Sequence, residues 1–153
     1  MTRVRIAIAL PVALALAAVL APSAPAATSK LYAFMDGKAE TTGGDTDGHA
    51  RIGLTFDRAK GRVCYDLRKF KLETAAGMHI HRGRKGKDGP HAVELFDKPT
   101  GAGKGKVTGC VSGVSRATID KILARPADYY ANVHTKTYPS GSVRGQLTKR
   151  KLV

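Results

Sequence analysis

Hydrophobic and polar residues alternate in short runs along most of the chain. Residues 50–57, for example, carry apolar side chains at every even position from Ala50 to Phe56 and mostly polar or small residues between them. A period of two is typical of β-strands that bury one face. The same pattern, interrupted by Gly, Asp and Pro, predicts about eight strands, over residues 30–36, 50–57, 62–70, 77–81, 92–96, 105–111, 129–135 and 142–147.

One segment follows a helical period instead. Within residues 115–124, the apolar residues Ile119, Ile122 and Leu123 fall on one side of a helix. Ser115 can cap its N-terminus, and the helix must end before Pro126. The chain is therefore predicted to be all-β, an antiparallel sandwich of about eight strands in two packed sheets with one short helix.

The N-terminal residues 1–26 have the organisation of a secretory signal peptide. Two arginines precede the apolar run 6–21, which is followed by small residues with Ala24 and Ala26 at the spacing of a cleavage site. The run is shorter than the roughly 20 residues that span a bilayer, which favours cleavage over retention as an anchor. We expect cleavage after Ala26 and a secreted, extracellular domain over residues 27–153.

The chain is strongly basic, with 26 Lys and Arg residues against 12 Asp and Glu residues and a formal net charge of +14. Such a charge attracts polyanions over a long range. The expected partner is an extracellular protein or a cell-surface polyanion, and teichoic acid, acidic polysaccharide and nucleic acid all qualify as the polyanion. The alternative is a solvated surface, because the cations are scattered and only residues 148–152 form a cluster.

Cys64 and Cys110 are the two cysteines of the chain. In an exported protein, oxidising conditions let such a pair persist as a disulfide, and we expect the two to be bonded. Two free, buried cysteines are the alternative. A metal site made by these two residues alone would lack ligands.

The candidate chemistry lies in the histidines. His79 and His81 are two residues apart on a predicted strand, so their side chains share a face. His134 would complete a three-imidazole site for copper or zinc if its strand lies beside that pair. His91 is a further candidate ligand. The alternative is that these imidazoles bond to backbone carbonyls and hold the Gly-rich loop 82–90.

Three segments together are similar to the CHRD domain, a module common in secreted bacterial proteins of unassigned function. They are residues 31–54, the "HIHRGRKGKDGP" of 79–90 and the "YYANVHTKTYPSGSVRGQL" of 129–147. The resemblance implies an immunoglobulin-like or superoxide-dismutase-like β-sandwich. The family usually has Glu where this chain has Ser142 and an aliphatic residue where it has His91, so His91 ranks below the other three histidines as a ligand.

The chain also resembles copper–zinc superoxide dismutases at a few positions: the His79 and His81 pair, "GPH" at 89–91, and a Gly-rich turn with Arg144. This resemblance implies copper binding or superoxide dismutation as the alternative to a binding or structural module. The segment between His91 and Cys110 holds no further histidine for a two-metal site. Hydrolytic and phosphate-loop motifs are absent from the sequence, which favours a function other than catalysis.

Overall fold

The computed structural model describes residues 28–98 and 105–151, so the predicted signal peptide lies outside the described residues. All eight predicted strands and the predicted helix are confirmed, with small differences at their ends. The elements are β1 (Ser29–Asp36), η1 (Gly37–Ala39), β2 (His49–Asp57), β3 (Arg62–Phe70), β4 (Gly77–Arg82), β5 (His91–Phe96), β6 (Lys106–Val111), α1 (Arg116–Ala124), η2 (Pro126–Asp128), β7 (Tyr129–His134) and β8 (Val143–Gln146).

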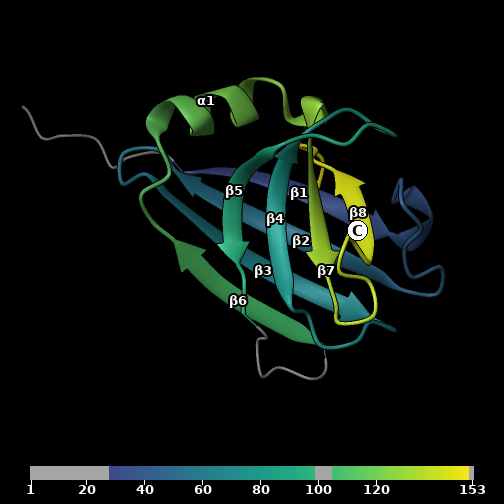
Figure 1. Ribbon diagram of the computed structural model, residues 1–153. Coiled ribbons are helices and arrows are strands. Elements are labelled where there is room, and N and C mark those ends of the chain that lie inside the picture. Colours follow the sequence, from purple (N-terminus) through teal and green to yellow (C-terminus); the bar gives the residue numbers. More distant parts are fainter. Residues whose placement is uncertain (1–27, 99–104, 152–153) are drawn as a thin grey trace, which may run out of the picture.

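The strands form one continuous antiparallel sheet in the order β5-β4-β7-β8-β1-β2-β3-β6. The sheet curls over itself, so that β5, β4 and β7 lie across β1, β2, β3 and β6 (Figure 1). Tyr65 of β3 and Phe96 of β5 meet across the interior, with ring centroids 5.7 Å apart. The all-β sandwich prediction is confirmed, and its two layers are the halves of a single, nearly closed sheet.

The core fills the space between these two halves. Alternate residues of each strand point inward, among them Leu54 of β2, Ile80 of β4 and Val133 of β7, all fully buried. Helix α1 covers one open end of the sheet (Figure 1) and buries Ile119 and Ile122 there. The remaining residues of each strand face outward, which leaves one outer face on each half of the sheet.

A disulfide joins Cys64 and Cys110, as predicted. The two residues are directly opposite each other on β3 and β6, so the bond ties the edge strand β6 to the sheet. Within residues 28–98 and 105–151, no helix has the length and apolar character needed to cross a membrane.

Candidate metal site

Two neighbouring strands carry the predicted histidines. On β4, Met78 and Ile80 point into the core, so His79 and His81 point to the outer face. Strand β7 pairs with β4, and its register places His134 opposite Gly77, diagonally next to His79. The hypothesis of a shared histidine face required these two strands to be neighbours, and they are.

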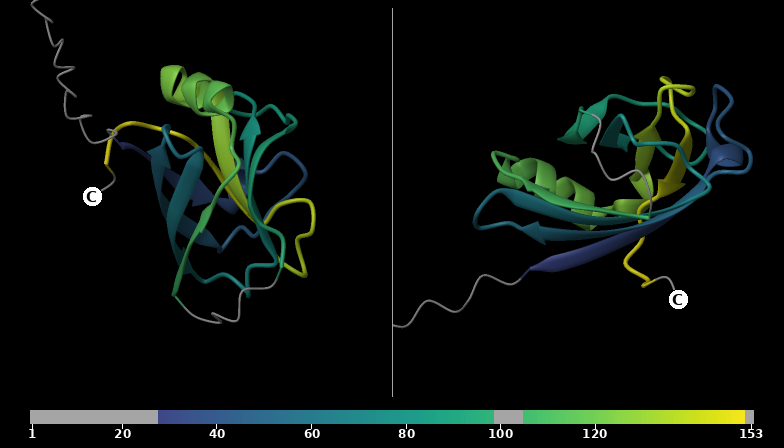
Figure 2. Two further views of the ribbon diagram at one scale, coloured as in Figure 1. Left: turned by 90° about the vertical axis from the view of Figure 1, so that its left-hand side faces the viewer. Right: turned by 90° about the horizontal axis from the view of Figure 1, so that it is seen from below.

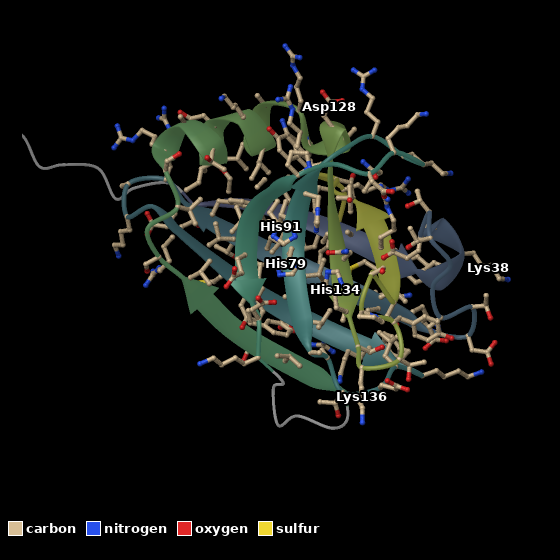
Figure 3. The ribbon with its side chains drawn as sticks, viewed as in Figure 1. Lys38, His79, His91, Asp128, His134 and Lys136 are labelled. Carbon is tan, nitrogen blue, oxygen red and sulfur yellow. A yellow bond between two sulfur atoms is a disulfide. The ribbon has the colours of Figure 1, made fainter. Side chains whose placement is uncertain are left out.

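Strand β5 pairs with the other side of β4 and adds His91 to the cluster. Two irregularities in the β4–β5 register place His91 opposite His81 and Glu94 opposite His79. As a result, one donor nitrogen from each of His79, His81 and His91 lies within 4.8 Å of the others. His79 also belongs to a second group of this kind, with the carboxylates of Glu94 and Asp97. Figure 3 shows His79, His91 and His134 close together on the front of the molecule.

The loop between β4 and β5 fixes the ring of His81. The Nδ1 atom lies 2.9 Å from the backbone oxygen of Gly89, which can only accept a hydrogen bond, so Nδ1 carries the proton. The other nitrogen, Nε2, then has a free lone pair. Nε2 is buried and has no hydrogen-bond partner within the described part of the chain. The contact with Gly89 thus fixes the tautomer and orientation of His81, as outer contacts do for metal-binding histidines in general.

His134 orients His79 in a similar way. The Nδ1 atom of His134 lies 2.9 Å from the backbone oxygen of Pro139, so its Nε2 atom accepts the proton of His79 Nδ1 across 3.0 Å. This leaves the lone pair of His79 Nε2 facing Asp97 Oδ1 at 3.3 Å. Two acceptors facing each other need a proton or a cation between them.

Burial keeps these imidazoles neutral. The pKa of His79 is lowered from 6.5 to about 4, first by burial and then by the neighbouring His91 and His134, while Asp97 acts in the opposite direction. Burial also lowers the pKa of His81 and of His134. The rings are therefore neutral near pH 7, and neutral imidazole is the form that binds metal ions.

Beside the histidines, Arg144 is buried against the ring of Tyr130, which stacks in turn on His81. The rings of His81 and Tyr130 are stacked with centroids 4.9 Å apart, and the guanidinium of Arg144 lies 3.6 Å from the centroid of the Tyr130 ring. Arg144 is 2% exposed and pairs with Asp88 at 2.9 Å. The arginine of the turn that resembles superoxide dismutase therefore holds the β4–β5 loop, and its charge is already paired.

The structure gathers the candidate residues differently from the ranking given by the sequence. His79 and His81 lie together, His134 contacts His79, and His91, ranked last, completes the group of three donor nitrogens. Sequence reasoning missed the carboxylates of Glu94 and Asp97. Strict alternation would put His91 and Glu94 on opposite faces of β5, and only the irregular register brings both to the outer face.

The nearly closed antiparallel sheet, with one helix over an open end and the Cys64–Cys110 disulfide, defines a small β-sandwich domain. Comparison with known protein families matches residues 31–147 to the CHRD domain, which is most of the chain, and the protein belongs to that family. No curated protein sequence and no solved structure gives a significant match.

Proposed function

We propose that this CHRD-domain protein is a secreted binding protein that holds one copper or zinc ion with His79, His81 and His91. The observation that carries this proposal is the convergence of three histidine donor nitrogens within 4.8 Å of one another. Imidazole suits both metals, and each ring would bind the ion at about 2.0–2.1 Å.

The surroundings of His79 and His81 support ligation over a purely structural role. Hydrogen bonds to Gly89 and His134 account for one nitrogen of His81 and one of His79, and leave the other nitrogen of each ring with a lone pair. Such outer contacts orient metal-binding histidines in general. Asp97 Oδ1, at 3.3 Å from His79 Nε2, belongs with Glu94 to the second group around His79 and places a carboxylate beside that lone pair.

The proposal includes export of the protein from the cell. Residues 1–26 are proposed to be a cleaved signal peptide, and the Cys64–Cys110 disulfide is compatible with an extracellular protein. In that setting the site would take up metal ions outside the cell.

Isothermal titration of the metal-stripped, disulfide-bonded protein with Cu(II) and with Zn(II) tests the site. We expect one ion per chain, and we expect His91→Ala to weaken binding by at least about tenfold, which corresponds to ~1.4 kcal/mol. His91 is exposed, so this variant should keep its fold. His49→Ala is the matched control, because His49 lies on β2 between Phe34 and Phe70. Unchanged binding by His91→Ala, or no binding at all, would contradict the proposal.

A further inference from the structure

The outer face of the β1–β2–β3–β6 half carries a row of cations. Across the strands, Phe34 is opposite Arg51, Arg51 is opposite Arg68, and Arg68 is opposite Lys106. Neighbouring strands are ~4.8 Å apart, and like charges directly opposite each other destabilise a sheet. Asp66 offsets part of this charge, with its carboxylate 3.0 Å from Lys106 Nζ and 3.9 Å from Arg68 Nε. Within the described residues, no ion pair offsets the charge of Arg51.

Aromatic rings lie beside these cations. Phe34 is 45% exposed and Phe70 is 41% exposed. The ring of His49 lies between them, with its centroid 6.0 Å from that of Phe34 and 5.2 Å from that of Phe70. Large apolar side chains that remain exposed next to one another, with polar residues around them, are typical of a binding surface.

A depression of about 320 Å³ lies over Gly53 on the same face, lined also by Tyr32, Arg51 and Arg68. Gly53 is paired with Tyr32 on one neighbouring strand and with Asp66 on the other. Because glycine has no side chain, the surface is hollow at this position. Beyond β8, the C-terminal segment runs antiparallel alongside β1 here (Figure 2). Two backbone hydrogen bonds of 2.8 Å join Tyr32 to Thr148, and Lys151 becomes part of the lining.

We propose that this basic aromatic face, defined by Tyr32, Phe34, Arg51, Arg68, Phe70 and Lys106, binds a linear acidic polysaccharide. The cations complement carboxylate or sulfate groups, and the exposed rings can stack on the C–H faces of sugar rings. The face is independent of the proposed metal site, which lies on the other half of the sheet.

Single-stranded nucleic acid is recognised by the same combination of cations and aromatic rings. The disulfide favours the polysaccharide, because disulfides persist in oxidising compartments outside the cytosol. Extracellular acidic polysaccharide is a polyanion of that compartment. Nucleic acid is therefore the competing outcome of the test.

Titration calorimetry with polygalacturonate, in buffer that contains a chelator, tests the face without any contribution from the metal site. The double variant Arg51→Gln/Arg68→Gln should weaken binding by about tenfold, since exposed ion pairs contribute roughly two- to fivefold each. The control is Lys38→Gln/Lys136→Gln, which removes the same charge from two exposed residues, labelled in Figure 3, that lie outside β1, β2, β3 and β6. An equal loss in both variants would show that net charge alone binds the polymer, and would overturn the proposal.

Gly53→Val provides a second variant that should not unfold the protein. A Cβ atom at Gly53 would lie 3.8 Å from the Tyr32 ring, an ordinary contact, and valine is favoured in strands. The side chain would project into the depression and reduce it, so we expect weaker polygalacturonate binding with an undiminished melting temperature. Unchanged binding would overturn the assignment of the depression to the polymer.

The choice of polymer is tested with two further probes, neutral dextran and oligothymidylate of matched charge. We expect polygalacturonate to bind more tightly than either, with an affinity that falls as salt is added. Tighter binding of the oligonucleotide would overturn the proposal in favour of nucleic acid. Equal binding of dextran would overturn the role of the cation row.

Discussion

The Nδ1–H group of His81 donates a hydrogen bond to the backbone oxygen of Gly89 across 2.9 Å, and this contact fixes the orientation of the ring. The loop can approach only because residue 89 is glycine. A Cβ atom there would lie 1.7 Å from the backbone oxygen of Arg82. One backbone contact thus links the Gly-rich sequence after β4 to the chemistry of the site.

Gly89→Ala should therefore weaken metal binding without removing any ligand. The added methyl group must displace the loop and loosen the bond to His81, and the loss of such an orienting contact typically costs 10–100-fold in affinity. Titration calorimetry measures this change. An unchanged affinity would show that the loop does not orient His81.

His134 is predicted to act on the metal through His79. His134→Ala removes the acceptor of the His79 Nδ1 proton and should weaken binding by roughly 10–100-fold. His134→Gln retains an acceptor oxygen and should lose less. If His134→Ala abolished binding while His91→Ala left it intact, the ligand set would be His79, His81 and His134, as the sequence first indicated.

The metal-free protein should lose stability as the pH falls from about 6.5 to about 4. The pKa of His79 is about 4 in the folded state, against 6.5 ordinarily. In that window the unfolded chain binds the proton and the folded chain does not, so lowering the pH favours unfolding. Urea unfolding in the presence of a chelator measures the free energy of unfolding at each pH. For His79→Asn, this free energy should change less with pH over the same window. An equal change in both proteins would contradict the low pKa.

Glu40 should make the stability of the fold depend on pH in the opposite direction. Burial raises its pKa from 4.5 to about 7, against the influence of Arg144, and its Oε1 atom is buried without a hydrogen-bond partner among the described residues. Between those pH values the folded state holds a proton that the unfolded state has lost, so stability falls as the pH rises.

The variant Glu40→Gln isolates this contribution from that of His79, whose window overlaps it. We expect Glu40→Gln to be more stable than the wild type at pH 8 and to gain less at pH 5, measured by urea unfolding of both proteins. A stability difference that does not change between pH 5 and pH 8 would rule out the raised pKa.

Loss of the disulfide should destabilise the fold substantially. Cys64 and Cys110 are 46 positions apart in the sequence, and removal of a native bridge from a small secreted domain typically costs about 2–5 kcal/mol. Denaturant unfolding of Cys110→Ser against the oxidised wild type measures this cost. The reduced wild type is the control and should match the variant. Equal stability of the oxidised and reduced wild type would contradict the prediction.

The fold could be predicted from the sequence because local patterns decide it. The period-two alternation from Ala50 to Phe56 specifies which side chains reach the core, and Ser115 and Pro126 mark the limits of the helix. The single, curled sheet could not be predicted in this way. It depends on β8 lying beside β1, a pairing between distant segments that no local pattern encodes.

The candidate site was only partly predictable for the same reason. The shared face of His79 and His81 follows from strand geometry. The contribution of His91 depends on an irregular register between β4 and β5, and that of Asp97 depends on where β5 ends. These are consequences of tertiary pairing, which overrides the simple alternation of a strand.

Anomalous diffraction from crystals grown with Zn(II), recorded on both sides of the zinc absorption edge, tests the metal site most directly. We expect one peak among the histidines, at about 2.0–2.1 Å from a ring nitrogen of each of His79, His81 and His91. An empty histidine cluster at saturating zinc, or a zinc peak at another place in the structure, would contradict the proposed metal site.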